Sequence, residues 1–238
     1  MDRQLNNNQI KNLKTVLKFR YVTTDNLAHY HSITTNSAYS ALEILVKAGY
    51  LDKIYEKSYR LLNKSARYFL TQPALTFLRN QADIQLDDAI WKSRKTDGKK
   101  TSDFIDLQVA IHAAHNGLVA RFGDKITIDT ALELHGTEGI IKPLPGLLVT
   151  PERGKRFFVE VADNQHLFFI RKRIRKYIEN YEANEWEWEL YPDVYIIRSS
   201  ASDRTRLRKF IYALMEDAYL DDSDFTFHII GSVGQIKL

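Results

Sequence analysis

The chain has 238 residues, of which 44% are hydrophobic and 12% aromatic, so it can bury substantial cores and is not wholly disordered. It contains no cysteine, which excludes a disulfide framework, thiolate zinc sites and a cysteine nucleophile. Its 34 Lys and Arg are unevenly spread: residues 1–100 carry 17 against 9 Asp and Glu, whereas residues 101–238 carry 17 against 21. A basic half and an acidic half predict two domains with different tasks.

Three helices are predicted in the first fifty residues. Apolar residues at helical spacing mark a first helix that starts at Asn6. Thr23, Thr24 and Asp25 offer N-cap chemistry for a short second helix. A third helix carries its own apolar stripe and ends at Gly49, which suits a left-handed C-terminal position.

The chain then changes from helices to short strands. Strand-like runs separated by polar turns predict a β-wing over residues 50–55, 59–62 and 66–71. Pro73 starts another helix that reaches Asn80. The following segment is polar and highly charged, so we expect a first domain over residues 1–80, a linker over 81–102 and a second domain over 103–238.

The second domain is predicted to combine helices with strands. The predicted order is helix, three strands, helix, strand, helix and strand, over residues 103–122, 125–133, 139–150, 156–162, 167–182, 193–199, 204–218 and 225–230. Pro151 and Gly154 favour a hairpin turn between the second and third strands. This order predicts a layered α/β domain, and the whole chain is expected to be of the α+β or α/β class.

Three helices followed by a β-wing are the plan of the winged helix-turn-helix, whose third helix enters the major groove of DNA. We expect base contacts from hydrogen-bonding residues near the start of that helix: Thr35, Asn36, Ser37, Tyr39 and Ser40. We expect phosphate contacts from basic residues at the helix end and in the wing: Lys47, Lys53, Lys57, Arg60, Lys64 and Arg67. The alternative is a structural or protein-binding winged helix.

A helix, a β-hairpin with an acid on its second strand and a basic helix form the layout of metal-dependent nucleases of the restriction-endonuclease type. In such sites two carboxylates bind Mg²⁺ and a nearby Lys steadies the attacking water. Glu160 occupies the second-strand position, and the basic helix contains Arg171, Lys172, Arg173, Arg175 and Lys176, a run that suits a DNA channel or an ordinary charged surface.

Five stretches occur in an order that links both domains: Ala48–Leu51, Tyr68–Thr71, Pro145–Val149, Phe158–Val161 and Arg173–Tyr177. Through them the chain resembles the replication-relaxation family of plasmids and other mobile elements. The resemblance implies an N-terminal winged helix joined to a C-terminal domain similar to the restriction-endonuclease fold.

The chain departs from that family where a nuclease needs its catalytic groups. Pro145 stands where the family has the metal-binding Asp, and Ala162 replaces the expected Lys. We therefore expect a domain that does not cleave DNA and needs no cofactor. The alternative is a Mg²⁺-dependent nickase or endonuclease, with Glu160 and Lys172 as catalytic residues and Glu160 and Asp163 as metal ligands. Lys176 and Glu133 are further substitutes, and a structural Glu160 paired with Arg156, Arg171 or Lys172 is the remaining interpretation.

Together these patterns predict a double-stranded DNA-binding protein of a mobile element or plasmid, acting in replication initiation or DNA relaxation without cutting DNA. A winged-helix transcriptional regulator is a further alternative. We expect double-stranded DNA as the main partner, with a second copy of the chain or replication and transfer proteins as others. No apolar run approaches about 18 residues, and residues 1–9 lack an apolar signal core, so we expect no membrane partner and a cytoplasmic location.

Overall fold

The computed structural model describes residues 5–62, 64–163 and 165–238. The chain divides into two units, Met1–His112 and Ala113–Leu238. Helices combine with a two-stranded ribbon and a mixed five-stranded sheet, so the predicted α+β class is confirmed. None of the helices in the described ranges has both the length and the apolar composition that a membrane span requires.

The first unit begins with three helices, α1 (Asn7–Phe19), α2 (Thr24–His31) and α3 (Thr35–Lys47), which confirm the three predicted ones. Each starts at a polar cap residue, Asn6, Thr23 or Thr34, whose side chain accepts a hydrogen bond from a backbone amide of the first turn. Their apolar stripes meet in a shared core: Leu13, Val16, Leu17, Leu27, Ala38, Leu42 and Leu45 are all buried.

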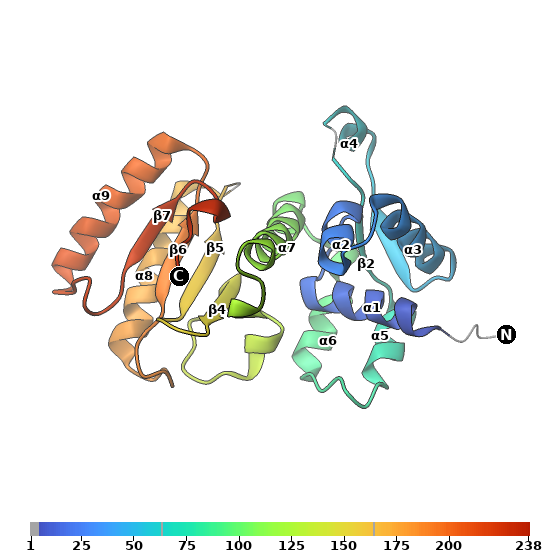
Figure 1. The fold of residues 1–238 in the computed structure, drawn as a ribbon, viewed down its shortest axis with the longest axis horizontal. Helices are drawn as coiled ribbons and strands as arrows, with labels where there is room; N and C mark the ends of the chain where they lie inside the picture. The colour runs from blue at the N-terminus through green and yellow to red at the C-terminus, as the bar shows by residue number, and fades with distance from the viewer. Residues whose placement is uncertain (1–4, 63, 164) are drawn as a thin grey trace. The chain divides into compact units, whose positions relative to one another are not determined.

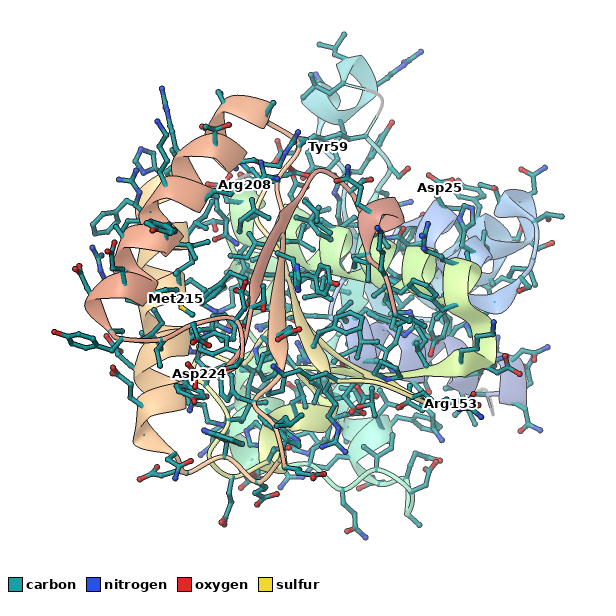
Figure 2. The ribbon with its side chains drawn as sticks, turned by 60° about the vertical axis from the view of Figure 1, so that its left-hand side comes forward. Asp25, Tyr59, Arg153, Arg208, Met215 and Asp224 are labelled. Carbon is teal, nitrogen blue, oxygen red and sulfur yellow. The ribbon has the colours of Figure 1, made fainter. Side chains whose placement is uncertain are left out.

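An antiparallel ribbon follows, formed by β1 (Leu51–Ile54) and β2 (Arg67–Leu70). Gly49 has a φ of 79° at the end of α3, as the sequence predicted. The strand predicted over residues 59–62 is wrong, because helix α4 (Lys57–Leu61) lies at the tip of the ribbon (Figure 1). Its backbone bonds are local, since the amide of Tyr59, which is labelled in Figure 2, donates to the carbonyl of Glu56 at 3.0 Å, so no third strand is added to the ribbon.

The rest of the first unit contains α5 (Gln72–Arg79), α6 (Asp88–Arg94) and the first part of α7 (Ser102–Phe122). The predicted linker over 81–102 therefore differs from the structure, where α6 buries Trp91. The charged composition that suggested a linker includes Asp97, which is buried and accepts a hydrogen bond from Arg20 Nε at 2.7 Å. Asp97 is therefore an internal partner of Arg20 in the fold, although most other charges of this segment are exposed.

The second unit contains a five-stranded sheet in the order β3 (Ile126–Thr130), β4 (Leu147–Pro151), β5 (Phe157–Val161), β6 (Asp193–Ile197) and β7 (Phe227–Ile230). The first three strands are antiparallel, and β5, β6 and β7 are parallel. Helices α8 (Leu167–Ala183) and α9 (Ala201–Asp217) provide the two parallel crossovers and cover one face of the sheet (Figure 1).

Alternation along the strands places one set of side chains against α8 and α9: Leu148, Phe158, Val194, Ile196 and Ile229. The long strand predicted over residues 139–150 forms only from Leu147 onward. Pro143 and Pro145 lack the amide hydrogens that a strand ladder requires, and Gly139 has a positive φ of 63°, so the preceding residues form a loop.

Candidate nucleic-acid interface

Helix α3 presents a polar face to solvent. Ala38, Leu42 and Leu45 are buried on its inner side. The five predicted base-contacting residues are all exposed: Thr35, Asn36, Ser37, Tyr39 and Ser40. At 3.6 residues per turn, Asn36, Ser40 and the exposed Lys47 fall on the side opposite the buried stripe. The structure therefore brings one amide, one hydroxyl and one ammonium group to a single open helix face.

Ser37 has a local structural partner within this helix. Its backbone amide donates to Thr34 Oγ1 at 3.2 Å, and the two hydroxyl oxygens lie 2.8 Å apart. This arrangement caps the helix and fixes the orientation of its first turn. Ser37 is thus exposed, but its hydroxyl lies within hydrogen-bond distance of Thr34. Asn36 and Ser40 carry the solvent-exposed hydrogen-bonding groups of this helix face.

Lys53 is held by α3, so it is not a free cation of the ribbon. Its Nζ lies 2.6 Å from Glu43 Oε1, and the same oxygen accepts a hydrogen bond from Tyr68 OH at 2.9 Å. Burial opposes ionisation of Glu43, but these hydrogen bonds outweigh it and lower the pKa of its carboxyl. The predicted phosphate ligand Lys53 instead connects the ribbon to α3.

Arg67 and Lys64 are likewise committed to the fold. Arg67 is buried, its Nη2 donates to Asp106 Oδ1 of α7 at 2.9 Å, and its guanidinium carbon lies 4.6 Å from the ring centre of Tyr59. Lys64 Nζ reaches Asp106 Oδ2 at 2.7 Å. Burial opposes ionisation of Asp106, but both hydrogen bonds lower its pKa overall. The expectation that Arg67 contacts a phosphate does not hold, because its charge faces inward.

Helix α4 leaves two predicted cations open at the tip of the ribbon. Lys57 and Arg60 are exposed and belong to no ion pair among the described residues. Beside them, Leu61 and Leu62 are 87% and 64% exposed. The exposure of both leucines was not predicted, because a strand would bury alternate side chains. Two adjacent leucines within a strongly basic turn were the signal that could have identified them.

Glu160, the predicted catalytic acid, lies on β5 and is bound by two side chains of α8. Its Oε1 accepts hydrogen bonds from Arg173 Nε at 2.8 Å and from Tyr177 OH at 2.5 Å. Arg173 Nη1 also donates to the carbonyl of Pro143 at 2.6 Å. The Glu160 and Arg173 side chains are only 17% and 15% exposed. Glu160 is therefore paired, as one interpretation of the sequence held, but with Arg173.

The pKa shifts around Glu160 follow from this pairing. Burial favours the neutral form of Arg173, but the Glu160 carboxylate outweighs it and raises the pKa of the guanidinium. Burial raises the pKa of Tyr177, and the adjacent carboxylate raises it further. Both effects keep Arg173 charged and Tyr177 protonated, which is the donor set that a structural carboxylate needs.

The other predicted catalytic and metal-binding residues do not gather around Glu160. Lys172 is exposed on α8, and Lys176 Nζ donates to the carbonyl of Lys142 at 3.1 Å. Asp163 Oδ1 accepts the amide of Ser199. Glu133 Oε2 accepts the amide and the hydroxyl of Thr130, at 2.7 and 2.6 Å. Glu133 thus holds the turn after β3, and Asp163 connects the segment after β5 to the segment after β6.

A Mg²⁺ ion does not fit this set of donors. The best-placed carboxylate, Glu160, is already neutralised by Arg173, and a second cation there would face that guanidinium. Among the described residues, no three His, Asp or Glu side chains come together in a way that could hold a metal. Hard cations need several oxygen ligands, and Oε1 of the Glu160 carboxylate already accepts hydrogen bonds from Arg173 and Tyr177.

Three of the six predicted phosphate ligands thus remain open, Lys47, Lys57 and Arg60, and the others sit in ion pairs. Comparisons with protein-family models, curated proteins and solved structures found no match for this chain. Its function therefore has to be inferred from its own residues.

Proposed function

We propose that this protein binds double-stranded DNA, with α3 in the major groove and the ribbon tip against the flanking backbone. One observation carries the proposal: Asn36, Ser40 and Lys47 form an exposed polar face on a helix whose opposite side is anchored in the core. The major groove is about 12 Å wide and admits one such helix. Three helices followed by a two-stranded ribbon are the elements that a winged helix uses in this way.

The open side chains suit distinct parts of a duplex. The Asn36 amide matches the paired donor and acceptor of an adenine edge, and Ser40 can donate to or accept from any base. Lys47, Lys57 and Arg60 would contact phosphates and release counterions. The exposed Leu61 and Leu62 at the tip would meet a groove wall, where apolar side chains are tolerated against DNA. Because α3 has no Arg or Lys in its first turn, we expect affinity to exceed sequence specificity.

In the second unit, the hairpin β4–β5 and the basic helix α8 suit a nuclease-like domain that does not cleave DNA. Glu160 is committed to Arg173 and Tyr177, so the acid that a nuclease would use has a structural task. Joined to the resemblance with the replication-relaxation family, this supports a protein of a mobile element that organises DNA during replication initiation or relaxation. The duplex is the ligand that this protein binds, and other proteins would cut it.

The proposal is tested by fluorescence anisotropy with a labelled random-sequence duplex at low salt. We expect the wild-type chain to bind and the triple variant Asn36→Ala/Ser40→Ala/Lys47→Ala to lose about tenfold to hundredfold in affinity, since it lacks base-edge and phosphate contacts. The control variant is Lys92→Ala, which removes an exposed lysine of α6 in the same unit. Equal affinity of the triple variant and the control would refute the proposal.

A further inference from the structure

A second cationic site lies in the second unit, in a groove between the start of α8 and the start of α9. Its volume is about 740 Å³, and its lining includes four arginines: Arg171 and Arg175 from α8, Arg198 at the end of β6, and Arg206 from α9. The lining contains one acidic side chain, Asp203. The second unit as a whole has more Asp and Glu than Lys and Arg, so this gathering of positive charge is local.

The charges in this groove are not balanced by the protein. Asp203 Oδ2 accepts hydrogen bonds from Arg198 Nη2 and Nε at 2.6 and 3.1 Å, and Arg206 approaches Asp203 only to 3.9 Å. Arg171 and Arg175 form no ion pair within the part of the chain that the structure describes. Asp203 therefore pairs closely with Arg198 and at longer range with Arg206, while Arg171 and Arg175 face the groove without a carboxylate partner among the described residues.

Packing holds two of these arginines in place without neutralising them. The guanidinium carbons of Arg171 and Arg175 lie 5.2 and 5.0 Å from the ring centre of Phe210 on α9. Arg171 Nε is screened from water and donates to no acceptor in the described residues. Two like charges one helical turn apart repel each other, and a buried donor without an acceptor is unfavourable. A bound anion would relieve both conditions.

Aromatic side chains border the same groove. Phe168 and Phe169, on the first turn of α8, are each 61% exposed, and their rings lie 5.5 Å apart in an edge-on arrangement. Phe168 also lines the groove. An exposed ring beside a row of cations is the combination that proteins use for unpaired bases, because every base can stack on a ring while the backbone runs along positive charge. A duplex keeps its bases stacked inside and could not use Phe168.

We propose that this groove binds single-stranded nucleic acid, with phosphates on Arg171, Arg175 and Arg206 and a base stacked on Phe168. The site goes beyond the proposed duplex contact, since it uses no residue of α3 or of the ribbon tip. It would allow the protein to hold a strand that has separated from its partner.

The test uses the full chain and a fluorescein-labelled oligothymidine of about 12 nucleotides, within the usual length that one binding module covers. We expect Arg171→Gln/Arg175→Gln to weaken binding by at least tenfold and to reduce the salt slope by about 1.4, or about 0.7 for each lost phosphate contact. Phe168→Ala is expected to lose roughly fivefold to a hundredfold, the range measured for base stacking on aromatic rings.

Controls separate this site from the rest of the molecule. Lys209→Gln removes an exposed lysine of α9 that does not line the groove, and should bind within about twofold of wild type. Arg206→Gln changes the groove without touching the Phe210 stack, so it tests the site if the double variant fails to fold. The α3 triple variant should keep its oligothymidine affinity, which separates this inference from the duplex proposal.

Three outcomes would overturn the inference. The first is no binding of oligothymidine by the wild-type chain. The second is equal affinity of the arginine variants and Lys209→Gln. The third is competition by thymidine monophosphate at the same concentration as the oligonucleotide, because that result would assign the groove to a free nucleotide and not to a strand.

Discussion

Replacing Glu160 by Gln distinguishes a structural carboxylate from a catalytic one. The amide of Gln keeps the shape of the side chain, and its oxygen can still accept the hydrogen bonds from Arg173 and Tyr177, but it no longer neutralises Arg173. Removing one partner of a fully buried ion pair costs about 3–5 kcal/mol. Since Glu160 and Arg173 are 17% and 15% exposed, water compensates part of this cost. We expect a loss of about 2–3 kcal/mol in the free energy of unfolding of the second unit, or roughly 5–10 °C in its melting temperature.

Differential scanning calorimetry of the full chain measures this loss, with Glu182→Gln as the matched control. Glu182 is an exposed carboxylate of α8, the helix that carries Arg173, and its neutralisation should change stability by less than about 0.5 kcal/mol. Adding Mg²⁺ should stabilise neither the wild-type chain nor the variant, whereas a ligand that binds the folded state raises its stability. A variant as stable as Glu182→Gln, together with a Mg²⁺-dependent stabilisation of the wild type that the variant lacks, would refute the structural role.

Three further predictions concern stability and DNA affinity. Asp106→Asn should destabilise the first unit by about 2 kcal/mol in urea unfolding, because it leaves buried Arg67 unpaired. Because the pKa of Asp106 is lowered, its contribution to the free energy of unfolding is complete above the ordinary carboxyl range and disappears as the pH falls through the lowered value. Asp106→Asn should therefore lose less stability in acid than the wild type does. An equal loss of stability in acid for both proteins would contradict this. Gly139→Ala should lower the melting temperature much more than Gly123→Ala. Both glycines have a positive φ, but only at Gly139 would the new Cβ collide with a backbone carbonyl. Equal effects of the two substitutions would contradict this close approach at Gly139. Lys57→Ala/Arg60→Ala should reduce the salt slope of duplex binding by about 1.8, and an unchanged slope would show that the tip does not contact phosphates.

Much of the fold could be predicted from local signals. The first three helices combine an apolar stripe with a cap residue such as Asn6 or Thr23, and both signals depend only on neighbouring residues. The two crossover helices of the second unit were predicted from their residue pattern alone, without a cap residue. The tip helix α4 was missed because its 5 residues are too few to show helical periodicity. The packed segment around α6 was missed because its packing depends on distant partners. Asp97 looks like linker composition until Arg20 is placed beside it.

In the candidate sites, too, local features could be predicted and features that depend on distant residues could not. Exposure of Asn36 and Ser40 follows from helical periodicity, so the sequence predicted it correctly. Whether a lysine or arginine is open depends on which acid the fold brings to it, and no local pattern places Asp106 beside Arg67. For the same reason the sequence suggested the wrong partners for Glu160. Arg173 lies thirteen residues away on a different element.

The most direct test of the DNA-binding claim uses the absence of cysteine from the chain, which allows a single photoactivatable label at any introduced thiol. Ser40→Cys places that label on the open face of α3, and Lys92→Cys places it on α6, which lies on the other side of α1 in Figure 1. The two labelled chains are irradiated with the same duplex at low salt. Strong crosslinking from position 40 and little from position 92 is the expected result. Equal crosslinking, or crosslinking from position 92 alone, would contradict the placement of α3 in the groove.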